Sequence, residues 1–386
     1  MKAVFWISLG LLAYTYVGYF VLLTLISPLA RRWRKPHRPD EQHTPRVTMV
    51  ISLHNEEKLI AQRIDNFEAL DYPPEKVELL LGDDYSSDRT RAIIRERMQR
   101  NPRIKLVEFD SHQGKTAVIN QLVPAARGKI VAFTDANTFW QPDALRLMTR
   151  HFADPHVGLV AGRLMLRSPM GVNTDDDYWA YETLIKRREG DLGVVLGAAG
   201  GVYTLRKALF RPLKSDVIQI DDFIWPVSVY EQGHRGVHEP AAVASEEAAP
   251  HVEAEFRRKV RIGTGNYRAL MECRRLLAPW RGWIAFAFWS HKVLRWIAPF
   301  LLLTLWVANA LLLDEPAYRV LFVLQTAFYG CALIGLFMSR QRHLVAKAFR
   351  LPYYFVGGNA ALLVGFLKCV TGQQQAAWSQ KAHRAG

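Results

Sequence analysis

The chain has 386 residues, of which 50% are hydrophobic and 22% charged, and its 50 Lys and Arg against 36 Asp and Glu give a formal net charge of +14. This composition excludes an intrinsically disordered chain, which would have few apolar residues and a high net charge. The three scattered cysteines, Cys273, Cys331 and Cys369, exclude a disulfide framework and a cysteine-rich zinc site.

The first element is an apolar stretch that runs from Ala3 to Ala30 without one charged residue. About 20 apolar residues span the core of a bilayer, so residues 1–30 are expected to form an N-terminal transmembrane helix. Basic residues follow at once, which places the N-terminus outside and the next region in the cytoplasm; they are Arg31, Arg32, Arg34, Lys35 and Arg38. A cleaved signal peptide is the alternative, but its charge would precede the apolar core.

Between residues 44 and 277, short apolar runs alternate with amphipathic helical patterns. The runs expected to form buried parallel strands are Val47–Leu53, Val77–Leu81, Ile104–Val107 and Ile130–Phe133. The expected helices between them are Glu57–Leu70, Thr90–Met98 and Thr116–Leu122. This alternation predicts a doubly wound α/β sheet, in which ligands bind beyond the carboxyl ends of the strands.

Polar residues directly follow three of these strands. Asp83 and Asp84 come after the second, Lys115 after the third, and Asp135 with Asn137 after the fourth. The acidic groups could accept hydrogen bonds from a nucleobase and ribose or hold a hard divalent cation, and the lysine could contact a phosphate. Neither a P-loop nor a G-x-G-x-x-G fingerprint is present. Each turn alone could be a helix cap or a turn former, but three at consecutive strand ends favour a ligand site.

The order and spacing of these segments resemble those of the family 2 glycosyltransferases, in particular the membrane-integrated branch with cellulose, hyaluronan and poly-N-acetylglucosamine synthases. The resemblance extends from about residue 47 to residue 261 and rests on the segments Val50–Glu57, Asp83–Asp88 and Gly114–Asn120. It implies a cytoplasmic α/β domain of the GT-A, Rossmann-like fold with a nucleotide-sugar donor, expected to be a UDP-sugar. Asp83 and Asp84 would contact the nucleotide, and Lys115 would lie near its diphosphate.

Two positions near the nucleotide depart from the family pattern. Tyr85 stands where the family usually has glycine, and Asp135 and Asn137 occupy its Asp-x-Asp position. In the family, two carboxylates there hold Mg²⁺ or Mn²⁺, which stabilises the leaving diphosphate as a Lewis acid. The amide of Asn137 can ligate through oxygen but brings no charge. We therefore expect Asp135 and Asn137 to hold the metal with help from the diphosphate or another carboxylate.

The resemblance also implies an acceptor site and a general base. Gly200 and Gly201 lie in a small-residue segment that in the family passes beneath the acceptor sugar, although a bend at a strand end predicts the same residues. Asp221 and Asp222 match the family's acidic pair at the head of a helix. Asp222 would deprotonate the acceptor hydroxyl, and Asp221, beside the acceptor, would help to raise the pKa of Asp222 by like charge. Helix capping is the alternative for both.

Arg258 and Arg261 lie in a segment that resembles the family's Gln-x-x-Arg-Trp motif. Arg261 matches the arginine, whereas Arg258 replaces the glutamine and Ile262 the tryptophan. Both arginines suit a diphosphate, so we expect them to bind the donor. In the family the tryptophan stacks on the acceptor saccharide. Its replacement by Ile262 predicts short products or single additions.

Three more uncharged runs follow: Trp296–Leu313, Val320–Ser339 and Leu351–Leu367. They predict three transmembrane helices within residues 296–370, of which the first and third are near the lower length limit. Residues 278–295 mix tryptophan with Arg and Lys, which suits a helix at the headgroup level, or else a buried amphipathic helix. The basic loop with Arg342 and His343 should be cytoplasmic, so four spans would place both termini outside.

These features together predict an inverting, multi-pass glycosyltransferase of the cell (inner or plasma) membrane, with residues 44–277 in the cytoplasm. It would extend a glycan of the cell surface, with membrane lipids and export proteins as candidate partners. One alternative is transfer of a single sugar to a lipid-linked acceptor. An alternative of another class is a non-catalytic nucleotide-sugar-binding membrane protein, which would not need Asp222. Nucleic acid is not an expected partner, because the basic residues flank apolar segments.

Overall fold

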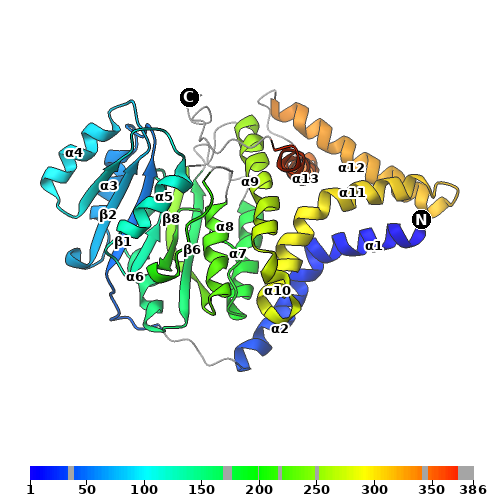
Figure 1. Ribbon diagram of the computed structural model, residues 1–386. Coiled ribbons are helices and arrows are strands. Elements are labelled where there is room, and N and C mark those ends of the chain that lie inside the picture. The colour runs from blue at the N-terminus through cyan, green and yellow to red at the C-terminus, as the bar shows by residue number, and fades with distance from the viewer. Residues whose placement is uncertain are drawn as a thin grey trace.

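The computed structural model describes residues 1–33, 39–167, 176–198, 200–215, 220–247, 252–340 and 347–372. An α/β domain lies beside a group of long apolar helices (Figure 1). Five of the basic residues expected to flank the apolar segments lie outside the described residues: Arg34, Lys35, Arg38, Arg342 and His343.

One mixed sheet of eight strands, in the order β3-β2-β1-β4-β7-β6-β8-β5, forms the centre of the α/β domain. Its strands are β1 (Val47–Leu53), β2 (Val77–Asp83), β3 (Ile104–Glu108), β4 (Ile130–Phe133), β5 (Phe139–Trp140), β6 (Val157–Arg167), β7 (Tyr203–Arg206) and β8 (Arg235–Glu247). The first four are parallel and lie where the apolar runs predicted them. β7 runs antiparallel to β4 and β6, and β5 antiparallel to β8, so half of the sheet is not a simple doubly wound array. The predicted GT-A, Rossmann-like α/β fold is confirmed.

Helices cover both faces of the sheet. The helices of the α/β domain are α3 (Ile60–Glu68), α4 (Thr90–Arg100), α5 (Lys115–Ala125), α6 (Ala144–Thr149), α7 (Asp176–Asp191), α8 (Asp221–Glu231) and α9 (Val252–Glu272). Alternate side chains of a strand point to opposite faces. Met49 and Ile51 of β1 accordingly join the core formed with α3, α4 and α6, whereas Val50 joins the core formed with α5 and α8.

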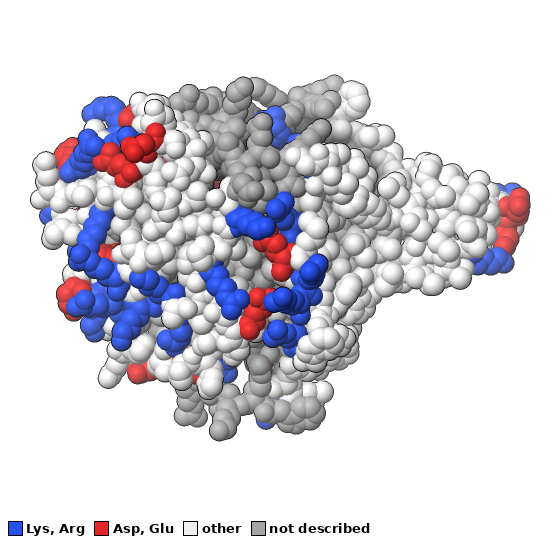
Figure 2. All heavy atoms as spheres, in the orientation of Figure 1, with Lys and Arg blue, Asp and Glu red and all other residues white. Residues whose placement is uncertain are grey.

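In the part of the chain that the structure describes, four apolar helices are long enough to cross a membrane: Lys2–Ala30, Trp283–Ala310, Pro316–Met338 and Ala348–Val370. They consist of α1 (Lys2–Ala13) and α2 (Tyr19–Trp33) around a π-helical turn, α10 (Trp283–Ala287) and α11 (Leu294–Ala310) around another, α12 (Pro316–Arg340) and α13 (Lys347–Val370). Figure 2 shows that the part projecting from the α/β domain carries almost no charge until its tip. At the far end of the bundle, the ammonium of Lys2 pairs with the Glu315 carboxylate at 2.8 Å.

Residues 278–295 were expected to form a separate interfacial helix, but the structure does not separate most of them from the next helix. From Trp283 onward the segment is the first part of the helix that continues to Ala310. Two basic residues of this segment, His291 and Arg295, have partners in α7. His291, which is fully buried, contacts Glu189 through Nδ1 at 2.8 Å and Glu182 through Nε2 at 3.2 Å.

The two carboxylates of α7 join the apolar helices to the α/β domain. Arg295 pairs with Glu182. The hydroxyl of Tyr19 donates a hydrogen bond to Glu189 Oε1 at 2.7 Å. Buried charges are stable only when they are paired and hydrogen-bonded, so these contacts fix α2, α7 and the helix from Trp283 against one another.

We expect Glu189→Gln to lower the melting temperature of the detergent-solubilised protein by about 5 °C or more, because it removes one charge from a buried ionic cluster. Glu96→Gln is the matched control, since Glu96 is 60% exposed in its pair with Arg100, and surface pairs contribute little. Thermal unfolding followed by intrinsic fluorescence measures both. Equal shifts in the two variants would contradict the role of the cluster.

Candidate active site

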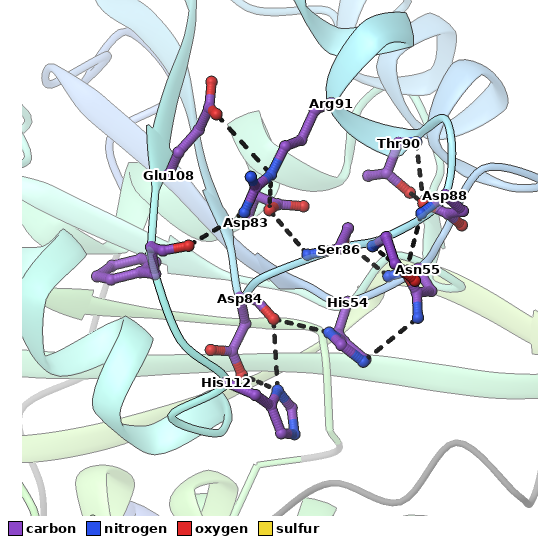
Figure 3. A network of polar contacts seen from close by, with 12 residues as sticks. His54, Asn55, Asp83, Asp84, Ser86, Asp88, Thr90, Arg91, Glu108 and His112 are labelled. Carbon is purple, nitrogen blue, oxygen red and sulfur yellow. Dashed lines mark hydrogen bonds and ion pairs between the residues drawn. The ribbon is translucent and has the colours of Figure 1, made fainter.

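Asp83 ends β2, and only one of its two carboxylate oxygens has a hydrogen-bond partner among the described residues. Its Oδ2 accepts hydrogen bonds from the Ser86 backbone N–H at 3.1 Å and from the Arg91 side chain (Figure 3). Its Oδ1 is buried and, among the described residues, accepts no hydrogen bond. An unsatisfied buried acceptor is costly, so this oxygen is suited to a donor group on a ligand.

Asp84 holds the loop that leads to α5. Its Oδ1 accepts a hydrogen bond from the Gln113 N–H at 2.7 Å, and its Oδ2 accepts one from the Gly114 N–H at 2.8 Å. His112 Nδ1 lies 2.8 Å from the same carboxylate. Both oxygens therefore have protein partners, and the geometry favours positioning of the next loop over direct contact with the donor.

Tyr85 explains why the corresponding family position is usually glycine. The backbone φ angle of Tyr85 is 62°, which lies in the left-handed region. L-residues with a side chain pay about 1–2 kcal/mol in this conformation, whereas glycine adopts it readily. The Tyr85 ring is 53% exposed and lies 6.0 Å from the Arg91 guanidinium carbon.

Lys115 brings three separate segments together at the carboxyl ends of the strands. Its ammonium lies 2.8 Å from Asp135 Oδ1, which follows β4, and 3.2 Å from Asp221 Oδ2, at the start of α8. Burial alone would lower the pKa of Lys115, but the Asp135 and Asp221 carboxylates outweigh it and raise the pKa above its ordinary value. The lysine therefore stays charged and holds both carboxylates in place.

Asp222 has the environment of a general base. Burial, followed by the like charge of Asp221, raises the pKa of Asp222 to about 6, against the opposing effect of Lys115. The direction agrees with the sequence-based expectation. Its backbone carbonyl accepts a hydrogen bond from the Ala198 N–H at 2.7 Å. This contact fixes the start of α8 to the glycine-containing segment.

Gly200 lies next to the carboxylate of Asp222, and Gly201 lies next to the side chain of Thr138. A Cβ at Gly200 would be 3.4 Å from Asp222 Oδ2, and one at Gly201 would be 2.6 Å from Thr138 Oγ1. Gly201 also has a φ of +76°, a backbone conformation that favours glycine, so the bend in the chain explains this residue. At Gly200 the nearby carboxylate of Asp222 limits the space for a side chain.

Asn137 contacts a carboxylate that the sequence analysis did not identify. Its Nδ2 donates a hydrogen bond to Glu246 Oε1 of β8 at 2.7 Å, across 109 residues of sequence. Burial, followed by the charge of Asp135, raises the pKa of Glu246 to about 7. No local motif marks Glu246, because only the pairing of β8 with the sheet brings it here.

Two further residues near Asp135 were not predicted. Burial and the charge of Asp135 raise the pKa of Glu56 to about 7. The hydroxyl of Tyr203 is buried without a hydrogen-bond partner among the described residues. Glu56 belongs to a segment that the sequence analysis recognised, so its acidic side chain was the available signal. For Tyr203, the sequence contained no signal of a functional role beyond its place in an apolar strand.

The oxygen atoms at this site fit a hard divalent cation. Asp135 and Glu246 supply carboxylates, and the Asn137 carbonyl oxygen stays available because its amide nitrogen makes the bond to Glu246. Among the described residues, no group of three or more His, Cys, Asp or Glu forms a complete metal site. A cation here would therefore take its remaining ligands from a bound diphosphate or water.

The two predicted arginines occupy different positions. Arg258 of α9 donates hydrogen bonds to Glu255 at 2.7 and 2.9 Å, and its charge acts on Glu246. Arg261 is exposed one turn further along α9. The structure therefore places Arg258 beside the site and gives Arg261 no contact with the carboxylates around Lys115 among the described residues.

The comparisons with known proteins agree with this geometry. Residues 48–211 match the family model for "Glycosyl transferase family 2". The match does not distinguish the cellulose and hyaluronan synthase branch.

Two curated relatives and one solved structure illustrate the similarity. A beta-monoglucosyldiacylglycerol synthase of Synechocystis is 32% identical over 121 residues, 31% of this chain and 25% of that protein. The probable glycosyltransferase YdaM of Bacillus subtilis is 22% identical over 62% of this chain and 59% of that protein. The chain covers only 25–37% of the length of the Synechocystis protein and of two further beta-monoglucosyldiacylglycerol synthases, from Trichormus variabilis and Nostoc.

The structure of the mannosyltransferase PcManGT of Pyrobaculum calidifontis, in complex with GDP-Man and Mn²⁺, shares the fold. It aligns with a TM-score of 0.71 and 23% identity over 96% of this chain and 99% of that one.

We expect Gly201→Ala to lower the melting temperature more than Gly233→Ala does. Both positions have a positive φ, +76° and +79°, but a Cβ at Gly233 would meet nothing within 4 Å, whereas one at Gly201 would clash with Thr138. Gly233→Ala thus measures the backbone strain alone, about 1–2 kcal/mol. Thermal unfolding of both variants gives the difference, and equal losses would show that the chain has room for a side chain at Gly201.

Proposed function

We propose that the protein is an inverting glycosyltransferase that transfers a sugar from a nucleotide diphosphate-sugar to a hydroxyl group of a membrane-bound acceptor. The observation that carries the proposal is the half-buried Asp222, with a pKa of about 6, beside the Lys115–Asp135–Asp221 cluster. A binding protein without catalytic activity would gain nothing from a carboxylate tuned to accept a proton near neutral pH.

Asp222 accepts the proton of the acceptor hydroxyl as the hydroxyl oxygen attacks the anomeric carbon. The bond between that carbon and the diphosphate oxygen breaks on the opposite face, so one displacement inverts the configuration. Lys115 orients Asp135 toward the donor and Asp221 toward Asp222, through contacts of 2.8 and 3.2 Å. No covalent intermediate on the protein is required.

The donor site lies over Asp83 and the loop held by Asp84. The free oxygen of Asp83 can accept a hydrogen bond from uracil N3–H or guanine N1–H, so a UDP-sugar is the first candidate and a GDP-sugar the second. Mg²⁺ or Mn²⁺, held by Asp135, Asn137 and Glu246, would supply Lewis-acid stabilisation of the leaving diphosphate. Arg258 adds positive charge beside that position.

The acceptor is proposed to be a lipid or a lipid-linked glycan, with the enzyme in the cell membrane and the α/β domain in the cytoplasm. The apolar bundle directly joined to α7 supports a membrane location. Relatives named as glycolipid synthases support a lipid acceptor. Ile262, in place of a stacking tryptophan, supports single or few additions over a long polymer.

Incubation of the solubilised protein with a panel of UDP- and GDP-sugars, Mg²⁺ or Mn²⁺ and membrane lipids tests the proposal. Transfer of labelled sugar to the lipid fraction, with release of the nucleoside diphosphate, is the expected result. Nucleotide-sugar binding without transfer or hydrolysis from any donor would favour the non-catalytic alternative.

Asp222→Asn is expected to reduce transfer by about 10²–10⁴, because the amide keeps the size of the side chain but cannot accept the proton. Binding of the nucleoside diphosphate should change little. Asp65→Asn, at an exposed position of α3, is the control. A transfer rate of Asp222→Asn close to that of the control would exclude the base role.

The same pKa predicts the pH dependence of wild-type turnover. Asp222 must be unprotonated to act, so kcat should be level above about pH 7 and fall about tenfold per unit below a pKa of about 6. A pH series with saturating donor measures it. A kcat that stays constant down to about pH 5 would show that no group with this pKa controls the reaction.

Glu246→Gln is expected to weaken Mn²⁺ binding by about tenfold or more, because it removes one of two proposed carboxylate ligands. Glu247→Gln, at the exposed neighbouring position, should bind Mn²⁺ as the wild type does. Electron paramagnetic resonance of free Mn²⁺, with UDP present, measures binding without relying on turnover.

The double variant Asn137→Asp/Glu246→Gln moves the carboxylate to the other partner of the hydrogen-bonded pair. It should recover most of the Mn²⁺ affinity that Glu246→Gln loses. Unchanged binding in Glu246→Gln, or no recovery in the double variant, would remove Glu246 from the metal site.

A further inference from the structure

The helix α13 has the length and composition of a membrane span, but its described contacts lie in the half of the bundle next to the α/β domain and reach no further than Phe328 and Tyr16, in the middle of their helices. Its first turns pack on the last turns of α12: a Cβ at Gly335 would lie 2.8 Å from Tyr353 Cβ and 3.1 Å from the Phe349 carbonyl oxygen. Since α12 starts at Pro316, at the far end, and ends at Arg340, α13 begins at the end next to the α/β domain.

The last turns of α13 return to the same end. The Phe366 ring lies 5.2 Å from the Tyr267 ring of α9 and 4.9 Å from the Phe300 ring of α11. Tyr267 in turn donates a hydrogen bond to the carbonyl of Trp296, at the beginning of α11. A helix that crossed the membrane would finish near the opposite ends of its neighbours.

The far half of the bundle is built from the other helices. Its buried cluster contains only residues of α1, α11 and α12 among the described residues: Phe5, Leu12, Ala298, Leu305, Ala308 and Tyr318. In Figure 1 these three helices reach the tip at the N-terminus, whereas α13 stays between α9 and α12. α13 also contacts Tyr16, whose hydroxyl accepts a hydrogen bond from the Asn359 amide nitrogen at 3.3 Å.

Close helix packing holds α13 in this position. A Cβ at Gly365 would lie 2.7 Å from backbone atoms of Gly263 and Thr264, so α9 and α13 touch through their backbones. Lys259 of α9 lies 5.4 Å from the Tyr354 ring centre. Contacts therefore connect α9 with both the beginning and the end of α13.

We infer that α13 does not cross the membrane but lies within the leaflet next to the α/β domain, with acyl chains as the partner of its outer face. Leu351, Leu367 and Val370 are 72%, 54% and 68% exposed and would contact lipid. Arg350 and Lys368 lie near the two ends, where long basic side chains reach the headgroups. The chain then crosses three times, and Thr371 lies on the same side as the α/β domain.

Cysteine labelling in intact cells tests this arrangement. In a chain with Cys273, Cys331 and Cys369 replaced by serine, single cysteines are introduced by Glu315→Cys at the far end, Glu96→Cys in the α/β domain and Thr371→Cys after α13. A membrane-impermeant maleimide is applied before and after permeabilisation. We expect Thr371→Cys to behave like Glu96→Cys and opposite to Glu315→Cys. Labelling of Thr371→Cys together with Glu315→Cys would establish a fourth span and overturn the inference.

A reporter fusion gives the same answer where the cysteine-free chain does not fold. Alkaline phosphatase fused to the C-terminus of the full chain should be inactive, and green fluorescent protein at the same place should fluoresce. An active phosphatase, with the α/β domain in the cytoplasm, would overturn the inference. Neither readout depends on catalysis, and the fusion uses only the proposed cytoplasmic location of the α/β domain, which labelling of Glu96→Cys reports separately.

Two glycines of α13 test its docking on α9. Gly365→Ala should lower the melting temperature, because its Cβ would clash with the α9 backbone, whereas a Cβ at Gly358 would meet nothing within 4 Å. Gly358→Ala should leave it unchanged or raise it, since alanine favours the helix by about 1 kcal/mol. Equal effects of the two substitutions would contradict the packing of α13 on α9.

Discussion

The ammonium of Lys115 is the contact on which the geometry of the site depends. It joins Asp135, after β4, to Asp221, at the start of α8, while Lys115 itself begins α5. A charged group in partly buried surroundings is stable only with such partners, so the pairing sets the relative positions of all three segments. Asp222 follows Asp221 on α8, so its position follows from this arrangement, whereas its pKa is raised by burial and by the like charge of Asp221, against the opposing charge of Lys115.

Single contacts accompany two of the positions at which this chain departs from the pattern of the family that it resembles. Tyr85 adopts the backbone conformation that a glycine would adopt more easily, and its exposed ring lies beside Arg91. Asn137 lacks the expected carboxylate, but its amide nitrogen binds Glu246, which returns a carboxylate to the same place.

The sequence was informative where structure is local and less so where it depends on long-range pairing. Buried apolar runs predicted β1 to β4, and polar residues at their ends predicted Asp83, Lys115 and Asp135. Glu246 and the antiparallel strands could not be found in this way, because β8 reaches the site only through pairing in the sheet. The composition of residues 283–295 suggested an interfacial helix because Glu182 and Glu189, the partners of its basic residues, lie over 100 positions away. Hydropathy alone also does not decide whether α13 crosses the bilayer or, as we infer, lies within one leaflet.

The central claim is a single displacement with Asp222 as the base, and the configuration of the product tests it most directly. The proton NMR spectrum of the transferred sugar gives the coupling constant of its anomeric proton, which distinguishes α from β linkage for a gluco-configured sugar. From an α-linked nucleotide-sugar donor, the account predicts a β-linked product. An α-linked product would show retention and would contradict direct attack by a hydroxyl that Asp222 deprotonates.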